Sequence, residues 1–425
     1  WYEVGLHCVE KSEVCPYDVR GYSFAGAPGV IIGHNDRIAW GFTNVGPDVQ
    51  DLYIERINPE NPDQYEINGQ WVDMDIVHET IEVNGRDEPV VLRVRSTRHG
   101  PIITDLGWLQ TANSFNLAAT PQNLPERLTL NALALRWTAL QPNTTFAAVL
   151  MLDRARNFEE FREALRYFDA PSQSVIYADV DGNIGYQTPG LIPIRACGDG
   201  SLPVPGWTDD CEWTGYIPYD ELPRAFNPEQ GYIVTANNPV VSDSYPYLIA
   251  TEFNYGYRAS RIVAMIESGG DGMSIADMQA MQADGLNLSA LEVIPYLEGL
   301  TWDDPSLSAA RDRLLAWDGQ MHMDSPDAAL YGFFWVALVG ETFHDELPED
   351  MWPDGDSRTQ AAIYRLLDDP RNAWWDDRTT PDVVETRDDI LARAFEEGYA
   401  AAVEALGSDP ARWRWGDVHT ATFAN

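Results

Sequence analysis

Two carboxylates, Asp48 and Asp51, follow a predicted β-hairpin at a spacing that could do chemistry. The segment from Val30 to Tyr53 reads VIIGHNDRIAWGFTNVGPDVQDLY, in which two apolar strands flank a polar turn and a Gly-Pro pair precedes the acids. Three interpretations are open. The carboxylates could form an acid/base pair as in glycosidases, ligate a hard cation such as calcium through oxygen atoms, or belong to a solvated loop of an acidic protein.

Other polar side chains stand at or beyond the ends of predicted strands. Asn44 follows IAWGFT, Asn237 and Asn238 end the predicted strand GYIVTANN (231–238), and Arg261 follows in YRASR. The sequence contains no G-x-S-x-G elbow, no H-E-x-x-H, no Walker loop and no G-x-G-x-x-G. Its seven histidines are scattered, so none pairs with another at the spacing of helical metal ligands. These residues alone therefore assign no reaction.

The elements that must position these groups change along the chain. Up to about residue 140 the pattern is mostly strand, with an Asn-Gly turn within YEINGQWV (65–72). Residues 144–168 have the period of one helix, and strands return over 174–187. There, DVDGN resembles part of an EF-hand loop but lacks the bidentate glutamate, so we predict a hairpin with an Asp-Gly turn. The order predicts an α+β fold, with a β-rich part (1–255) that contains one inserted helix and a helical part (256–425) packed on the same domain.

The composition limits the partners. The formal net charge is −39, and Lys11 is the single lysine. Such a field repels nucleic acid and anionic membranes, so we expect neither as a partner. No apolar stretch approaches the roughly 18 residues of a membrane helix. The cysteines form two local pairs, Cys8/Cys15 and Cys197/Cys211, which predict either two disulfides or free thiols.

Longer motifs give the sequence a family resemblance. They are GLHC, YDVRGYSFAGAPGVIIGHNDRIAWGFTNVGPDVQDLY, RHGPI, YADVDGNIGYQ, LPVPG, GYIVTANN, YRASRI and WGDVH, and they span essentially the whole chain. In these segments and in their order the chain resembles the β chain of the penicillin acylase family of N-terminal-nucleophile hydrolases. The resemblance implies a four-layer αββα sandwich, autoproteolysis of a zymogen precursor, and export to the periplasm or beyond.

The resemblance also implies a mechanism. A serine at the N-terminus of the mature β chain attacks an amide carbonyl, and its own α-amino group acts as the base. A backbone N–H and an asparagine side chain hold the oxyanion, and these donors map to Asn44 and Asn237. Arg261 maps to the arginine that organises the nucleophile's surroundings. Ile32, Phe42 and Gln173 map to the acyl pocket.

The acidic loop gains a role by the same resemblance. Asp48, Gln50 and Asp51 match positions at which family members bind a structural Ca²⁺, with a backbone carbonyl from the middle residue. Further ligands would come from a carbonyl near Gly200, from Glu252 and from the α chain of the same precursor. The resemblance implies no organic cofactor.

One departure from the family concerns the nucleophile. Its expected position lies before Trp1, so we predict that this β-chain fragment alone hydrolyses no amide. The expected substrate is a small-molecule amide of the penicillin, acyl-homoserine lactone or other N-acyl amide type. The apolar Ile32 and Phe42 favour an apolar acyl chain over a dicarboxylic one. A non-catalytic homologue that serves as a binding or structural protein is the alternative.

Overall fold

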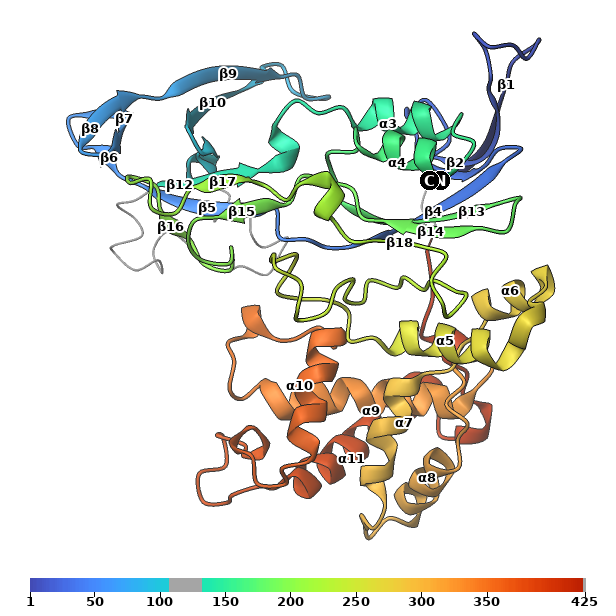
Figure 1. Ribbon diagram of the computed structural model, residues 1–425. Coiled ribbons are helices and arrows are strands. Elements are labelled where there is room, and N and C mark those ends of the chain that lie inside the picture. The colour runs from blue at the N-terminus through green and yellow to red at the C-terminus, as the bar shows by residue number, and fades with distance from the viewer. Residues whose placement is uncertain (107–131, 423–425) are drawn as a thin grey trace. The chain divides into compact units, whose positions relative to one another are not determined.

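The chain divides into two compact units, Trp1–Phe253 and Asn254–Asn425. The computed structural model describes residues 1–106 and 132–422. Strands dominate the first unit and helices the second (Figure 1). This succession agrees with the predicted α+β class.

A seven-stranded antiparallel sheet forms the part of the first unit that carries Asn44. The strand order is β1-β2-β3-β4-β13-β14-β18. The strands are β1 (Tyr2–His7), β2 (Asp18–Ser23), β3 (Ile32–His34), β4 (Ile38–Asn44), β13 (Gln173–Asp179), β14 (Ile184–Gln187) and β18 (Arg224–Phe226). The predicted hairpin with the Asp-Gly turn is confirmed, because Gly182 at φ 90° lies in the turn between β13 and β14.

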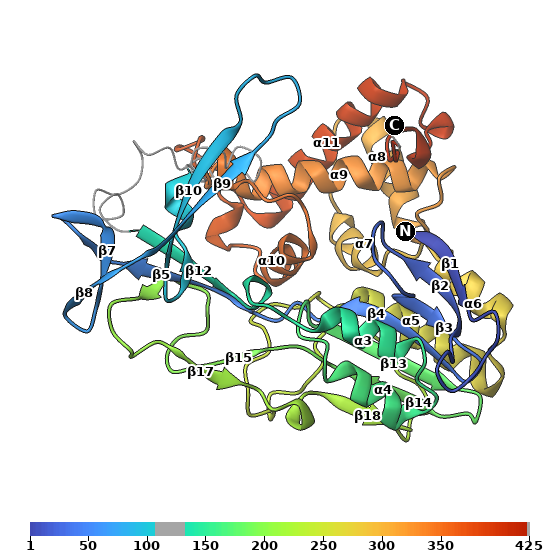
Figure 2. The same cartoon turned by 90° about the horizontal axis from the view of Figure 1, so that it is seen from above.

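Two helices cover one face of this sheet, as the two views show (Figures 1 and 2). They are α3 (Thr145–Leu152) and α4 (Phe158–Leu165), and Leu152 and Phe161 are fully buried with Trp40 and Val175 of the sheet in one apolar cluster. The prediction of a single helix over 144–168 is wrong. Asn157 caps α4 by accepting the backbone N–H of Glu160, so the chain starts a new helix there.

Smaller sheets complete the first unit. Their orders are β12-β5-β16, β11-β10-β9 and β6-β7-β8, with a β15–β17 pair. The strands are β5 (Gln50–Glu55), β6 (Ile57–Asn58), β7 (Asn61–Ile67), β8 (Gln70–Asp73), β9 (Asp75–Ile81), β10 (Val90–Thr97), β11 (Gly100–Pro101), β12 (Ala132–Trp137), β15 (Pro193–Arg195), β16 (Val204–Pro205) and β17 (Trp213–Tyr216). The 3-10 helices are η1 (Ile103–Leu106), η3 (Thr138–Leu140) and η4 (Tyr219–Glu221). The Asn-Gly hairpin is confirmed between β7 and β8, since Asn68 and Gly69 both have positive φ.

The predicted strand over 231–238 does not form. This segment is irregular, and Asn237 adopts the left-handed conformation at φ 64°. The Asn238 side-chain oxygen accepts the backbone N–H of Ala236 at 3.0 Å. Such local side-chain hydrogen bonds compete with a strand ladder and turn the chain instead.

Both predicted disulfides form, Cys8–Cys15 and Cys197–Cys211. The first closes a loop between β1 and β2, and the second closes the segment that joins β15 to β17. The free-thiol alternative is therefore wrong.

The second unit is helical around its own apolar core. The long helices α9 and α11 pack against each other and contribute Phe334, Leu338 and Phe395, all fully buried. The α-helices are α5 (Tyr257–Gly269), α6 (Ile275–Gln282), α7 (Leu288–Val293), α8 (Pro305–Leu315), α9 (Pro326–Phe343), α10 (Ser357–Leu367) and α11 (Arg387–Leu406). The 3-10 helices are η5 (Gly270–Gly272), η6 (Ile294–Leu297), η7 (Glu349–Met351), η8 (Ala373–Trp375), η9 (Pro410–Arg412) and η10 (Trp415–Asp417). Within residues 1–106 and 132–422, no helix is both long and apolar enough to cross a membrane.

Candidate functional site

Asn44 and Asn237, the two predicted oxyanion residues, lie in direct contact. Asn44 is the last residue of β4, and Asn237 follows the buried Ala236 in the irregular segment. The Asn237 side-chain Nδ2 donates to the Asn44 carbonyl oxygen at 2.8 Å. One amide side chain and the end of one strand are therefore brought together from positions 193 residues apart.

Two of the predicted pocket residues lie next to Asn44. Gln173 pairs with Asn44 across β13 and β4, and its side-chain Nε2 donates to Asn44 Oδ1 at 2.8 Å. Phe42 stands two residues earlier on the same face of β4, because side chains alternate along a strand. Its ring packs edge-on against Phe168 with centroids 5.7 Å apart. Ile32 begins the neighbouring strand β3 and is half-buried.

One loop fixes the chain that follows Asn44. The side chain of Val45 is 3% exposed and packs in an apolar cluster with Ile249 and Val240. Three residues further on, the backbone N–H of Asp48 donates to the Ile249 carbonyl at 3.0 Å. The loop that carries Asn237 thus runs beside the segment from Asn44 to the acidic pair. It contacts this segment at Val45 through apolar packing and at Asp48 through a backbone hydrogen bond.

The acidic pair shares one cation, Arg195, which the sequence did not single out. Its guanidinium binds Asp51 in a bidentate manner, with Nε 2.9 Å from Oδ2 and Nη2 2.8 Å from Oδ1. Nη2 also lies 3.3 Å from Asp48 Oδ1 and donates to the Asp48 carbonyl at 3.0 Å. Asp51 is 5% exposed, so the interpretation as a solvated loop is wrong for this residue.

Trp213 completes the surroundings of Asp51. Its indole Nε1 donates to Asp51 Oδ2 at 2.6 Å, and Trp213 lies opposite Arg195 in the β15–β17 pair. The disulfide Cys197–Cys211 joins the two strands just beyond this pair. Paired strands and a covalent link therefore hold both donors on Asp51.

The charge around the pair suits a cation. Two carboxylates face one guanidinium, and burial raises the pKa of Asp48, assisted by the charge of Asp51 and opposed by Arg195. Gly200 crosses directly over the pair, since a Cβ there would lie 2.2 Å from Asp48 Oδ2 and 2.7 Å from Asp51 Oδ1. Carboxylate and backbone oxygens are the ligands that calcium accepts, so these residues fit part of a calcium site. Among the described residues, no cluster of three or more His, Cys, Asp or Glu side chains could hold a metal.

The other predicted site residues have separate surroundings. Gln50 begins β5, two residues after Asp48, and its backbone nitrogen lies 3.5 Å from Asp48 Oδ1. Glu252 is exposed, three residues after Ile249, and its role as a ligand stays a prediction. Arg261 lies in α5 of the second unit and forms a bidentate ion pair with Asp284, with both N–O distances 2.7 Å. Its predicted role beside a nucleophile also stays a prediction.

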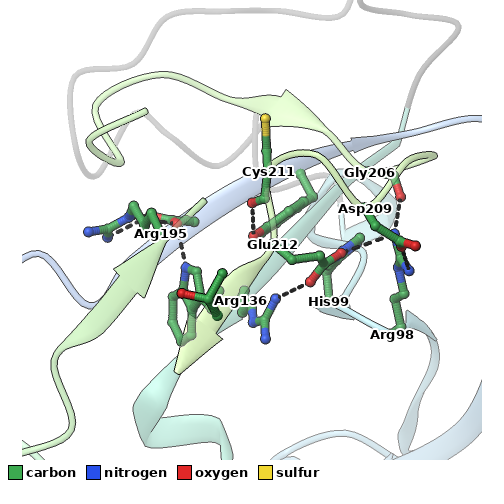
Figure 3. A network of polar contacts seen from close by, with 12 residues as sticks. Arg98, His99, Arg136, Arg195, Gly206, Asp209, Cys211 and Glu212 are labelled. Carbon is green, nitrogen blue, oxygen red and sulfur yellow. Dashed lines mark hydrogen bonds and ion pairs between the residues drawn. The ribbon is translucent and has the colours of Figure 1, made fainter. Parts of the chain in front are cut away.

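A buried cluster of charges, also absent from the sequence predictions, adjoins β5. His99 and Glu55 are fully buried at their side chains, and His99 Nδ1 lies 2.7 Å from Glu55 Oε1. His99 Nε2 lies 2.7 Å from Glu212 Oε1, and Arg136 binds the other oxygen of Glu212 at 2.6 Å (Figure 3). The His99 ring stacks on Tyr53 with centroids 3.7 Å apart.

This cluster places the His99 imidazole between two carboxylates. Burial opposes the charged form, but the hydrogen bonds with Glu212 and Glu55 outweigh it and raise the pKa of His99. Burial likewise opposes the charge on Glu212, yet His99 and Arg136 lower the pKa of Glu212 to about 2. The Oε2 atom of Glu55 is buried without a hydrogen-bond partner, and His99 is the one ion-pair partner of Glu55 among the described residues.

The missed residues carried a weak signal. Arg195 stands two positions before Cys197, and Trp213 two positions after Cys211, so a disulfide between the cysteines brings them opposite each other. No local sequence pattern linked this hairpin to Asp51, because Asp51 lies 144 residues before Arg195. His99 belongs to the quoted motif RHGPI, but no local pattern linked it to Glu55.

Comparisons with known proteins agree on one family. The family model described as penicillin amidase matches residues 1–425. Acyl-homoserine lactone acylase QuiP of Pseudomonas fluorescens is 31% identical over 96% of this chain and 51% of its own length, and that of Pseudomonas aeruginosa is 32% identical over 95% and 49%. Penicillin G acylase of Escherichia coli is 32% identical over 75% of this chain and 35% of its own.

A solved structure gives the same result. The thermostable penicillin G acylase from Alcaligenes faecalis matches with a TM-score of 0.72 and 26% identity, over 97% of this chain and 74% of that chain. This likeness confirms the predicted α+β hydrolase fold. The chain spans about half the length of the curated relatives it matches.

Proposed function

Because this chain belongs to the penicillin amidase family, we propose that it is part of the β chain of an acylase that hydrolyses a linear amide bond. The observation that carries the proposal is the contact between Asn237 Nδ2 and the last residue of β4, at 2.8 Å. The family resemblance assigns oxyanion stabilisation to these two residues. The named acylases among the relatives support the same class of reaction.

The proposed reaction begins at the amide carbonyl. A nucleophilic hydroxyl oxygen bonds to the carbonyl carbon, and the carbonyl oxygen takes the negative charge. The backbone N–H of Asn44 and the side-chain amide of Asn237 would donate to that oxygen, and such donors act because their dipoles are already in place. Collapse of the intermediate breaks the C–N bond, and the amine leaves with the proton that the hydroxyl gave up. Water then hydrolyses the ester in the same way and releases the acid.

We propose that the nucleophile is a serine at the N-terminus of the mature β chain, supplied by a part of the precursor that comes before Trp1. Its own α-amino group would take the hydroxyl proton and return it to the leaving amine. The residues described in the first unit would then bind and orient the substrate without supplying the base. This proposal follows from the family resemblance.

The acyl group is proposed to be apolar. Phe42 lies two positions from Asn44 on the same strand face, and its ring reaches the apolar cluster under α3 and α4. The side-chain amide of Gln173 already donates a hydrogen bond to Asn44 Oδ1. An acyl-homoserine lactone or an arylacetyl amide fits this lining better than a dicarboxylic amide, whose second carboxylate would lose its hydration there.

We further propose a structural Ca²⁺ at Asp48 and Asp51, with backbone oxygens near Gln50 and Gly200. Excess negative charge beside Arg195 and the close approach of Gly200 support this site. Glu252 and the α chain of the precursor would supply the remaining ligands. The ion would hold the end of the segment that begins at Asn44. Export to the periplasm or beyond is also proposed, and the two disulfides are consistent with an oxidising compartment.

The test uses the processed αβ enzyme produced from its full precursor. N-acyl-homoserine lactones and phenylacetyl amides are offered in parallel, and amine release is measured. Asn237→Ala should lower kcat by about 10²- to 10³-fold with little change in KM, because an oxyanion donor acts mainly in the transition state. Asn227→Ala, at another asparagine with positive φ in an outer turn, is the matched control and should retain activity.

Two results would overturn the proposal. One is a mature β chain that begins with a residue other than Ser, Thr or Cys, as read by N-terminal sequencing. That result would favour a binding or structural protein. The other is amide hydrolysis by residues 1–425 alone, which would place the nucleophile within this chain.

A further inference from the structure

A cavity of about 400 Å³ opens within the second unit. It lies between the start of α5, the α7–η6 segment and the end of α10. Its lining combines aromatic rings, short apolar side chains and charges of both signs: Tyr255, Leu291, Glu292, Pro295, Tyr296, Tyr364, Arg365, Leu367 and Asp368. None of these residues is among those assigned to amide hydrolysis, so the cavity is argued from its own lining.

Tyrosine rings form one wall of the cavity. The ring centroids of Tyr255 and Tyr364 are 6.0 Å apart, and Tyr257 packs behind both at 5.2 Å and 5.7 Å. The Tyr364 hydroxyl donates to the Ser289 carbonyl at 2.8 Å, which fixes the ring. Fixed aromatic rings lose little conformational entropy when a ligand binds, so the wall is already organised.

Two carboxylates are held at the edge of this wall by phenol groups. The Tyr257 hydroxyl donates to Glu292, and the Tyr296 hydroxyl donates to Asp368 Oδ1 at 3.0 Å. An ionised carboxylate accepts about four hydrogen bonds, so each keeps acceptor capacity for a ligand. The phenols also fix the direction in which each carboxylate points.

Another lining tyrosine of the cavity, Tyr296, already contacts a cation. The guanidinium carbon of Arg387 lies 4.9 Å from the centroid of the Tyr296 ring. Arg387 is in turn anchored by donating to the Leu367 carbonyl at 2.7 Å. This contact is a cation–π interaction made by a lining residue of the cavity.

We propose that this cavity binds a small organic cation, an ammonium group carried on an apolar or aromatic body. The ammonium would lie between Glu292 and Asp368, and the body would pack on Tyr255 and Tyr364. Aromatic rings combined with carboxylates select ammonium cations, because the ring faces are electronegative and the carboxylates supply the counter-charge. Arg365 also lines the cavity and would repel a second cationic group.

The test compares three probes of similar size by ligand-observed NMR titration of the full chain at pH 7. Benzylammonium is cationic, benzyl alcohol is neutral and benzoate is anionic. We expect benzylammonium to bind with a Kd on the order of 1 mM, and the other two probes about tenfold more weakly. Equal binding of the cation and the alcohol would overturn the charge argument, and tighter binding of benzoate would assign the site to Arg365 instead.

Variants locate the binding in this cavity. Glu292→Gln keeps an acceptor for Tyr257 and should weaken benzylammonium binding about fivefold. Tyr364→Leu should weaken it similarly, whereas Tyr364→Phe keeps the ring and should stay within about twofold. Glu404→Gln, the same change on an exposed face of α11, is the control and should leave binding unchanged. Unaltered binding in Glu292→Gln and Tyr364→Leu would overturn the proposal.

Discussion

Replacing His99 by leucine should destabilise the first unit strongly. The imidazole is fully buried, and it is the one charged partner of Glu55 among the described residues. Removing one partner of a buried ion pair typically costs about 3 to 5 kcal/mol, because the remaining charge is left without compensation. Glu212 keeps Arg136 and Arg98, so most of the loss should come from Glu55. For a unit of this size the melting temperature should fall by about 10 °C.

The assay is thermal and urea unfolding followed by circular dichroism. His78→Leu is the matched control, because His78 is exposed on β9 and should change the unfolding free energy by less than about 0.5 kcal/mol. Adding Glu55→Gln to His99→Leu removes the unbalanced charge and should restore about half of the loss. The reasoning is refuted if His99→Leu is no more destabilising than His78→Leu, or if the second change restores nothing.

The same cluster gives a pH dependence with a defined sign. The pKa of His99 is raised, so the stability that its charge contributes is complete below the ordinary histidine pKa of about 6.5 and is lost as the pH rises through the folded value. The pKa of Glu212 is lowered to about 2, so its contribution is complete above its ordinary range and is lost as the pH falls towards about 2. The cluster should therefore stabilise the unit most between about pH 4.5 and 6.5.

Two further predictions concern Asp153 and Gly200. Burial raises the pKa of Asp153 to about 7, although the hydrogen bond from the Val30 backbone N–H acts to lower it. The ionisation of Asp153 therefore destabilises the fold as the pH rises from about 4 to about 7. Asp153→Asn should remove that slope and add about 2 kcal/mol of unfolding free energy at pH 8, and an unchanged urea-unfolding profile across this range would contradict it. Gly200→Ala should place a methyl group on Asp48 and weaken calcium binding by the full αβ enzyme at least about tenfold in calorimetric titration, whereas Gly182→Ala, at a similar φ in open space, should leave it intact. Equal calcium affinities in the two variants would count against the proposed metal site.

Local patterns predicted much of the fold. The Asn-Gly turn at Asn68 requires positive φ at both central residues, and the structure has it, because this chemistry is decided within four residues. The helix over 144–168 was predicted as one element because its apolar period continues across the break. The structure instead begins a second helix after Asn157, because the side chain of Asn157 accepts the backbone N–H of Glu160 and so caps α4.

Some residues of the candidate site were also predictable from the sequence, and others were not. The asparagine pair and the acidic loop were accessible through a long, specific motif and the family resemblance. The partners of Asp51 were not, because Arg195 and Trp213 meet it only through strand pairing and a distant disulfide. The cluster around His99 was missed for the same reason, as Glu55 lies 44 residues away and Glu212 lies 113 residues away.

The position of Arg195 and Trp213 on Asp51 also sets an order of events during synthesis. The strand that carries Asp51 emerges from the ribosome 144 residues before Arg195 and 162 residues before Trp213. Until both arrive, Asp51 has neither its guanidinium nor its indole donor, and a contact of such long range is slow to close. This corner of the first unit therefore forms late, after the local hairpins. A nascent chain that stops before Arg195 would leave both carboxylates of the acidic loop without their guanidinium partner.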